Sequence, residues 1–585
     1  MKVETLNPFS VFQEEFSNEN LAVRINAIRR LPLVIFAAGV NTSTIKELLA
    51  IIDEIFKNND DDEVFMGLAE SFKLLIGVIP LKTMIAYLES LLKIEETSVR
   101  EKTVEAYNLL IREVSDDDFK NLVIVSINGL LKSASFISQI SAINLIPAIF
   151  DRVNDEIKLE FIKKIGELLE KDESLILKRT LVIQLGKILT CITYDTLLNQ
   201  IFNHFKKLCG DDSDIIRIAT ITSLIELAKV FSPEDNKTYL IPLIIQITGD
   251  KSWKVRHYLA SEFHNLAEAV GSELTENSLI SIFSTLLRDA ENEVRVLSIK
   301  SLKKMIHLLS VEKATSLVSY ITSIIKDSIP LVRLGCSEVL GEILKMNLSG
   351  FDKDFLKIKI SVIIVEFIND KDIEVKIETI KLLPLWAKYV GTYILDLIAS
   401  EGLKISGDHQ SWRVRIAVIE AYSKMTLEFK NQKIFEKSIK KILIDGLEDK
   451  CYSVRIFTVT CIKEIFPVLE PDYIIDNIYK PILILSTNLG KFYACRITAI
   501  QGLGVICEHL KTNEKVKAEV IKTLFALAED KVVNVRQSAI KELQLLEQLG
   551  IVSSNDQHYR SFFETFISNE SDREIRSIVQ KILKL

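Results

Sequence analysis

The chain has 585 residues, which exceeds the usual ceiling of about 250–300 residues for one compact core, so several domains or a repeat array are required. Hydrophobic residues make up 48% of the sequence, but there are only 20 Gly and 11 Pro, which is too few for a chain rich in loops. This composition predicts a nearly all-helical protein. The net charge of −7 and the lack of a Lys/Arg-rich block exclude generic nucleic-acid binding.

The N-terminal stretch, MKVETLNPFSVFQEEF, has acidic residues and no apolar core, so it does not form a secretory signal peptide. The longest uncharged run, 133–150, contains four Ser, a Gln, an Asn and a Pro, and predicts a turn with a buried helix rather than a membrane span. The seven cysteines show no C-x-x-C spacing, which is typical of free thiols in a reducing compartment. We expect a soluble cytoplasmic protein without a membrane partner, and leave a nuclear location open.

A short motif recurs along the chain: Asp, a few small or polar residues, an apolar residue and then a basic residue. Clear copies are DKSWKVR at 250–256, DAENEVR at 289–295 and DKVVNVR at 530–536. Fifteen copies about 39 residues apart account for the whole chain, 1–585, as one continuous array. Phe65 and Gln139 occupy the basic position in two copies. In the others it is Arg24, Arg100, Lys178, Arg217, Arg256, Arg295, Arg333, Lys376, Arg415, Arg455, Arg496, Arg536 and Arg576.

Each motif lies between two amphipathic stretches, such as 236–248 before it and 255–269 after it. Two short helices joined by a polar turn cannot bury their apolar faces alone, but stacked copies can. The sequence therefore predicts an all-α protein, an α-solenoid of about fifteen two-helix repeats of the HEAT type. The residue before the basic position is apolar in fourteen copies and is Ser138 in the other, so we expect it to be the first core contact of the second helix.

An Asp precedes the basic position by six residues in eight copies. Such an Asp can accept backbone N–H bonds at the start of the second helix, and it can pair with the Arg of the neighbouring copy. We therefore predict an Asp–Arg ladder along the turns and assign both positions to architecture rather than to binding. The eight are Asp172, Asp211, Asp250, Asp289, Asp327, Asp370, Asp449 and Asp530.

No pattern typical of catalysis or metal binding is present in the sequence. The seven histidines are scattered, and there is no HExxH, GxxxxGK[ST], GxSxG or paired His/Cys spacing. Cys507 and His509 lie two residues apart, and such residues do not face each other on a helix. We expect no enzyme activity, no cofactor and no metal.

The turns differ from repeat to repeat, and such variation on a regular frame is where binding specificity is expected. The residue three before the basic position is apolar or aromatic in five consecutive repeats, which we call the C-terminal stripe. Trp and Tyr anchor protein interfaces, so the stripe predicts a protein-docking site. The alternative is that each residue only closes its own turn. The stripe consists of Ile373, Trp412, Tyr452, Tyr493 and Val533.

The N-terminal turns carry mixed charges instead. Their placement on successive turns suggests a second, more polar partner surface, although charge clusters are also ordinary on a solvated face. The predicted residues are Asp61, Asp62, Glu63, Glu95, Glu96, Glu173, Lys178, Arg179, Asp211, Asp212, Trp253 and Lys254.

Several of these segments resemble the scaffold, or A, subunit of protein phosphatase 2A. They are DKSWKVR (250–256), SWRVRIAVIEAYSKM (411–425), DDDEVFMGLAESF (60–72), LESLLKIEETSVREKTVEAY (88–107) and DKVVNVRQSAIKEL (530–543). The resemblance implies a non-catalytic, horseshoe-shaped scaffold. It also implies that a catalytic Ser/Thr phosphatase subunit docks on repeats 11–15 (390–585), and that an interchangeable B-type regulatory subunit docks on repeats 1–10 (12–385).

Matched residue by residue, the resemblance places catalytic-subunit contacts at Trp412, Arg413, Tyr452, Tyr493, Val533 and Asn534. Regulatory contacts fall at Glu63, Glu96, Glu173, Lys178, Arg179, Trp253 and Lys254. The chain departs from the family at 135–139, where the family has a Trp-containing turn, at Leu175 in place of Pro and at Lys178 in place of Arg. The turn before Arg415 has one extra residue. Three of these departures fall on the regulatory side.

A HEAT/armadillo-type transport receptor or another assembly scaffold is the alternative function. Such receptors are usually longer and strongly acidic, with Asn or Trp on the inner helices, whereas the aromatic residues here lie in turns.

Overall fold

The computed structural model describes residues 7–58, 61–170, 174–189, 195–346, 353–390, 411–429, 439–553 and 557–583. These residues form helices and no strands, so the predicted all-α fold is confirmed. They belong to two compact units, Met1–Leu286 and Leu287–Leu585. The boundary between the units differs from the predicted division between the two partner-binding sides at 385–390, which stays a prediction.

The repeats of the first unit follow one another in chain order. Their first helices are α1 (Pro8–Phe16), α4 (Thr42–Asn58), α6 (Leu81–Leu91), α8 with α9 (Asp116–Asp118, Ile124–Leu131), α11 (Asp155–Glu170), α13 (Asp195–Leu208), α15 with α16 (Pro233–Asp235, Ile241–Thr248) and α18 with α19 (Ser272–Leu274, Ile280–Leu286). Their second helices are α2 with α3 (Leu21–Arg29, Leu31–Ala38), α5 (Asp62–Leu75), α7 (Thr97–Glu113), α10 (Phe136–Ile149), α12 (Leu175–Leu189), α14 (Asp214–Ala228) and α17 (Trp253–Val270).

The second unit continues the same alternation. Its first helices are α21 (Val311–Ile324), α23 (Lys353–Ile368), α28 (Lys440–Leu447), α30 with α31 (Pro471–Ile474, Lys480–Thr487), α33 (Glu514–Ala528) and α35 (Gln557–Asn569). Its second helices are α20 (Asn292–Met305), α22 (Pro330–Lys345), α24 (Ile373–Val390), α26 (Trp412–Phe429), α29 (Tyr452–Ile465), α32 (Tyr493–His509), α34 (Val533–Gln548) and α36 (Arg573–Leu583).

Each of these second helices begins three residues before the basic position, so the residues that the sequence analysis placed in the turns are the first helical residues, and α17 begins two residues before the expected stretch 255–269. Of the fourteen apolar residues that precede the basic position, only Val23 is half-buried and the rest are buried, as is Ser138. A buried residue at the first turn anchors the helix start to the core. The first residue of each second helix lies two residues before this anchor and is exposed in every repeat except at Leu21 and Asp214, which are half-buried.

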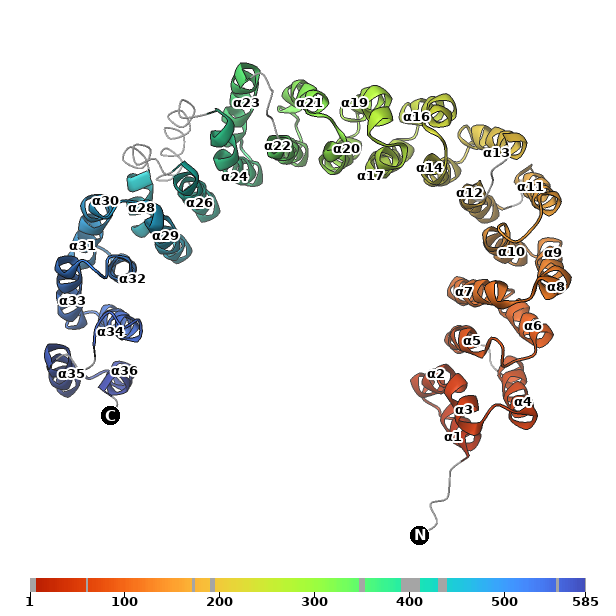
Figure 1. Ribbon diagram of the computed structural model, residues 1–585, viewed down its shortest axis with the longest axis horizontal. Helices are drawn as coiled ribbons and strands as arrows, with labels where there is room; N and C mark the ends of the chain where they lie inside the picture. Colours follow the sequence, from red (N-terminus) through yellow and green to blue (C-terminus); the bar gives the residue numbers. More distant parts are fainter. Residues whose placement is uncertain are drawn as a thin grey trace, which may run out of the picture. The chain divides into compact units, whose positions relative to one another are not determined.

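Second helices of neighbouring repeats pack directly on one another within each unit. Examples are α5 on α7 and α12 on α14 in the first unit, and α24 on α26 and α32 on α34 in the second. Figure 1 shows the second helices of each unit in one row and the first helices in another. The α-solenoid of two-helix repeats is thus confirmed.

Several first helices contain a π-helical turn that the sequence did not predict. The stretch 236–248, expected as one helix, is a π-helical segment at Asn236–Leu240 followed by α16. Similar segments occur at Phe119–Val123, Thr275–Leu279 and Ile475–Tyr479. A π-turn takes up one extra residue without ending the helix, so it leaves the hydrophobic periodicity nearly unchanged.

Candidate functional site

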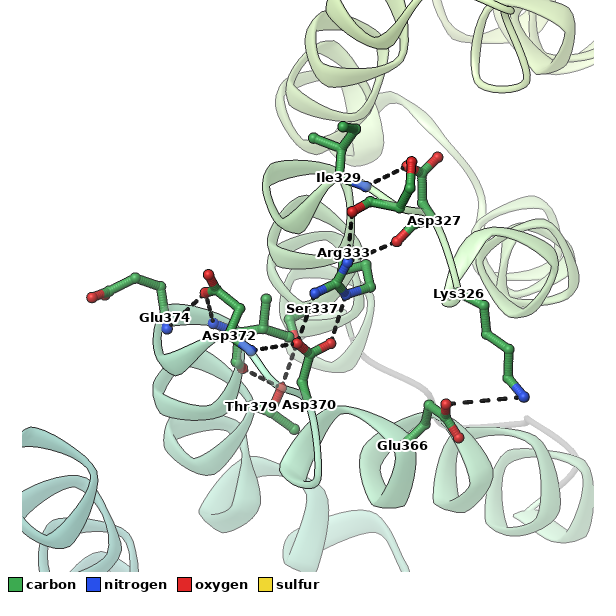
Figure 2. Close-up of polar contacts among 12 residues, drawn as sticks. Lys326, Asp327, Ile329, Arg333, Ser337, Glu366, Asp370, Asp372, Glu374 and Thr379 are labelled. Atoms are coloured by element: carbon green, nitrogen blue, oxygen red, sulfur yellow. Dashed lines mark hydrogen bonds and ion pairs between the residues drawn. The ribbon is translucent and has the colours of Figure 1, made fainter. Parts of the chain in front are cut away.

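The turns between the two helices of each repeat are held by the Asp–Arg ladder. In Figure 2, Arg333 of one repeat donates hydrogen bonds from Nε and Nη2 to the Asp370 carboxylate of the next repeat, at 2.6 and 2.8 Å. Its Nη1 atom donates to the carbonyl oxygen of Asp327, in its own turn, at 2.7 Å. The Asp370 carboxylate also accepts the Asp372 backbone N–H at 2.8 Å. One guanidinium therefore joins two successive turns.

The ladder recurs in both units, so the predicted pairing of the Asp position with the basic position of the neighbouring repeat is confirmed where a pair is described. The sequence analysis missed the bond that several of these Arg residues, such as Arg217 and Arg295, donate to a carbonyl oxygen of their own turn. The further pairs are Lys178–Asp211, Arg217–Asp250, Arg295–Asp327, Arg415–Asp449, Arg496–Asp530 and, with Glu replacing Asp, Arg536–Glu570.

Electrostatics within the ladder are consistent with permanent ion pairs. Hydrogen bonding to Asp370 raises the pKa of Arg333. Burial alone would raise the pKa of Asp370, but hydrogen bonds from Arg333 and the Asp372 N–H outweigh it and hold the pKa below its ordinary value. Both side chains stay charged across the physiological range, so the ion pair that joins the two turns persists there.

The C-terminal stripe is exposed along its whole length. Each stripe residue is the first residue of a second helix, and these helices pack on one another in order, α24, α26, α29, α32 and α34. The exposed fractions are 40% for Ile373, 45% for Trp412, 64% for Tyr452, 37% for Tyr493 and 42% for Val533. The five side chains therefore contribute exposed apolar surface, and the docking of a protein on the stripe stays a prediction.

Two further predicted residues lie beside the stripe. Arg413 follows Trp412 and forms a bidentate ion pair with Glu374, its Nη2 atom lying 2.9 Å from Oε2, between exposed side chains. Asn534 follows Val533 and is exposed. The sequence analysis missed Phe492 and Leu489, which are 59% and 74% exposed and precede Tyr493. They enlarge the apolar surface at this turn, and their position four or more residues before the basic residue kept them out of the pattern.

The acidic turns of the first unit are partly engaged within the chain. Asp61 and Glu96 cap α5 and α7 by accepting backbone N–H bonds from Glu63 and Ser98. Lys178 and Asp211 form a ladder pair. The exposed predicted residues are Asp62, Glu63, Glu95, Glu96, Arg179, Asp212, Trp253 and Lys254, whereas Glu173 lies outside the described residues.

Apolar side chains also lie exposed on the N-terminal turns, where the sequence analysis expected a polar surface. Phe136, Leu175 and Trp253 begin their second helices and are 41–48% exposed, and Ile176 and Ile215 follow on α12 and α14 at 62% and 43%. We call these five residues the N-terminal apolar group. Trp253 was among the predicted contacts, whereas Ile176 and Ile215 were missed because the sequence pattern did not consider the second residue of each helix.

Within the described ranges, no group of three His, Cys, Asp or Glu side chains is arranged to hold a metal ion. No described helix is both long and apolar enough to cross a bilayer. Of the described cysteines, five are buried and Cys451 is half-buried, and burial raises the pKa of Cys209 to about 12 and of Cys461 to about 11. These thiols are structural rather than nucleophilic.

Comparison with known proteins supports the resemblance inferred from the turns. The chain is 28% identical over 282 residues to the PP2A regulatory A subunit of Saccharomyces cerevisiae, which covers 46% of this chain and 44% of that protein. It is 24% identical over 355 residues to the beta isoform of the human 65 kDa regulatory A subunit of protein phosphatase 2A, covering 58% of each. The matches thus span about half the length of these relatives. The segments that carry the resemblance, by contrast, are spread along the whole chain. Residues 78–337 also match a family described as PIK3R4-like, middle domain.

Solved structures share the fold at low sequence identity. The karyopherin Kap121p bound to Nup53p superposes on 99% of this chain and 69% of its own, with a TM-score of 0.54 and 12% identity, and a Kap95p structure gives 0.53 over 97% and 76%. At this identity the likeness concerns the fold alone. In sequence, the chain is similar over about half of its length to regulatory A subunits of protein phosphatase 2A, and in fold it is similar to helical-repeat α-solenoids.

Proposed function

We propose that the chain is the non-catalytic scaffold of a Ser/Thr protein phosphatase 2A holoenzyme. The observation that carries the proposal is the C-terminal stripe, five exposed apolar residues at equivalent positions on neighbouring helices, in a chain whose curated relatives are named as PP2A regulatory A subunits. A continuous apolar surface built on rigid turns suits a permanent protein partner. The catalytic subunit is that partner, on repeats 11–15.

A variable B-type regulatory subunit occupies the turns of the N-terminal repeats in this proposal. The exposed acidic turns and the N-terminal apolar group together supply the charged rim and apolar centre of an ordinary interface. Holding two subunits on one chain raises the effective concentration of each beside the other. The scaffold thereby selects substrates without any catalytic group of its own.

A transport receptor is the second candidate, since karyopherins share the fold. Sequence similarity favours the phosphatase scaffold, because the sequence identity to the karyopherin structure is only 12%. Isolation of the tagged chain from native extract separates the two functions. A co-purifying Ser/Thr phosphatase supports the scaffold, and a co-purifying small GTPase without phosphatase contradicts it.

The stripe is tested by Trp412→Ala and Tyr493→Ala, with titration calorimetry against the purified catalytic subunit. Each substitution should weaken binding by about 2 kcal/mol or more, which is the scale of aromatic anchors. The matched control is Leu331→Ala, because Leu331 is 52% exposed near the start of α22, outside the stripe. Melting temperatures should stay within a few degrees of wild type. Equal losses for all three variants, or unfolding by Trp412→Ala with affinity retained, would rule the stripe out as the docking site.

A further inference from the structure

The Asp–Arg ladder is interrupted after Arg455, near the start of α29. Arg455 is only 4% exposed, yet it forms no ion pair with any described residue. Its Nη1 atom donates to the Asp449 carbonyl oxygen at 2.7 Å, and its Nε atom donates to the Thr498 hydroxyl at 3.2 Å. The cause is Gly490, which stands six residues before Arg496, where the neighbouring repeats carry Asp.

This arrangement leaves a buried positive charge with neutral acceptors only. In the equivalent place, Arg333 directs Nε and Nη2 to a carboxylate. Burying a charge without a counter-charge is unfavourable, and a carboxylate brought to it recovers part of that cost. Arg455 is therefore prepared to receive an anionic group.

The two adjacent turns offer no spare carboxylate. Asp449 is paired with Arg415, and its neighbour Glu448 is paired with Lys491, whose Nζ atom lies 2.6 Å from Oε2. Asp449 thus meets Arg455 only through its backbone. The missing charge has to come from outside these turns.

Arg455, which lacks an ion-pair partner among the described residues, lies beside the C-terminal stripe. The Tyr452 ring centroid is 5.8 Å from Cζ of Arg455, and Tyr452 is the most exposed stripe residue. In the next turn the rings of Phe492 and Tyr493 lie 4.7 Å apart, and Leu489 is exposed beside them. An apolar partner segment covering these side chains would exclude water from the guanidinium and strengthen an ion pair formed there.

We propose that a protein docked on the C-terminal stripe supplies an Asp or Glu carboxylate to Arg455, in the place that the Asp370 carboxylate occupies beside Arg333. The recognised segment is an acidic residue flanked by apolar ones. The inference rests on the proposed function for the identity of the partner, the phosphatase catalytic subunit, which serves as the probe.

Gly490→Asp tests the proposal by restoring the ladder carboxylate within the chain. A Cβ atom added at Gly490 would lie 3.2 Å from the Asn488 Oδ1 atom, which accepts the Gly490 N–H, so this side chain must shift by a few tenths of an ångström to admit Asp. The variant should melt at a higher temperature, and its affinity for the catalytic subunit should fall at least about tenfold, since the in-chain carboxylate competes with the partner. Gly490→Asn, equal in size and uncharged, should keep the affinity within about twofold.

Arg455→Met is a second variant that tests the proposal independently. It removes the charge and keeps the volume, so it should cause a similar loss of affinity without lowering the melting temperature, and combining it with Gly490→Asp should cause no further loss. Wild-type affinity in Arg455→Met overturns the proposal. If that happens while Trp412→Ala still weakens binding, the scaffold function stands; if the wild-type chain does not bind the catalytic subunit, both fail.

Discussion

Arg333 and Asp370 belong to successive repeats and are joined by two hydrogen bonds of 2.6 and 2.8 Å, while side-chain exposures of 13% and 7% keep water away from the pair. Removing the acid leaves the guanidinium buried without its counter-charge. Asp370→Ala should therefore lower the free energy of unfolding by about 3 kcal/mol or more.

The control for this change is an exposed ion pair that is also drawn in Figure 2. Lys326 and Glu366 form an ion pair at 4.0 Å whose side chains are 78% and 47% exposed. Glu366→Ala should change stability by less than about 1 kcal/mol, since exposed pairs contribute little. Thermal and urea unfolding of both variants measure the difference, and equal effects would contradict the structural role of the ladder.

Stability should depend on pH through Glu542 on α34. Burial and, secondarily, the negative charge of Glu508 raise the pKa of Glu542 to about 7, although Lys463 partly opposes this. A raised carboxyl pKa contributes stability that is present below the unfolded-state pKa and is lost as the pH rises through about 7. Glu542→Gln should therefore gain stability relative to wild type between about pH 5 and 8, on the order of 2 kcal/mol.

The measurement is the difference in melting temperature between variant and wild type across that pH range. Glu529→Gln, at an exposed position before α34, is the control and should show a constant difference. A constant difference for Glu542→Gln as well would show that the carboxyl group titrates normally.

Substitution by alanine should change the stability of the protein in opposite directions at two helical glycines. At Gly186 on α12, an added Cβ would lie 2.9 Å from the Ser223 Cα atom of α14, so Gly186→Ala must push two packed helices apart. At Gly129 on α9, nothing lies within 4 Å. Gly129→Ala should stabilise by about 0.5–1 kcal/mol through helix propensity, and Gly186→Ala should destabilise by about 1–3 kcal/mol. Melting temperatures that move in the same direction would contradict the packing at this crossing.

Binding of the regulatory subunit should depend on the N-terminal apolar group. Ile176→Asp places a charge on the 62% exposed second position of α12, where an acidic residue favours the helix, so folding should be unaffected. Affinity for a B-type subunit should fall at least about tenfold, because the charge would be buried in an apolar contact. Ile358→Asp, at a 67% exposed position on α23, should bind normally in the same calorimetric assay. Unchanged affinity of Ile176→Asp would remove the N-terminal apolar group from the interface.

Helix starts could be predicted to within about two residues because one motif repeats fifteen times: the stretch expected from 255 begins as a helix at Trp253. A single copy such as DKSWKVR is weak evidence for a turn, but its recurrence fixes the register of Trp253, Trp412 and the other first helical residues. The ladder partners followed from the same spacing, since stacked repeats bring each Arg to the next Asp.

What the sequence did not predict depends on the exposure of single side chains. Ile176 and Phe492 differ from buried residues in no local pattern, and only the packed helices show that they face solvent. The unpaired state of Arg455 is similar, because a Gly at position 490 signals a missing carboxylate only once Arg455 is known to be buried.

The direction of the ladder also bears on how such a chain can lengthen. Every described ladder pair takes its cation from one repeat and its acid from the following one, so a tandem duplication of a repeat that carries both groups reproduces both halves of the pair. A gene fragment cut in register could therefore be copied or deleted without disturbing its neighbours, whereas a cut within a turn would separate Arg from its own carbonyl partner. The pairing rule itself favours growth by whole repeats.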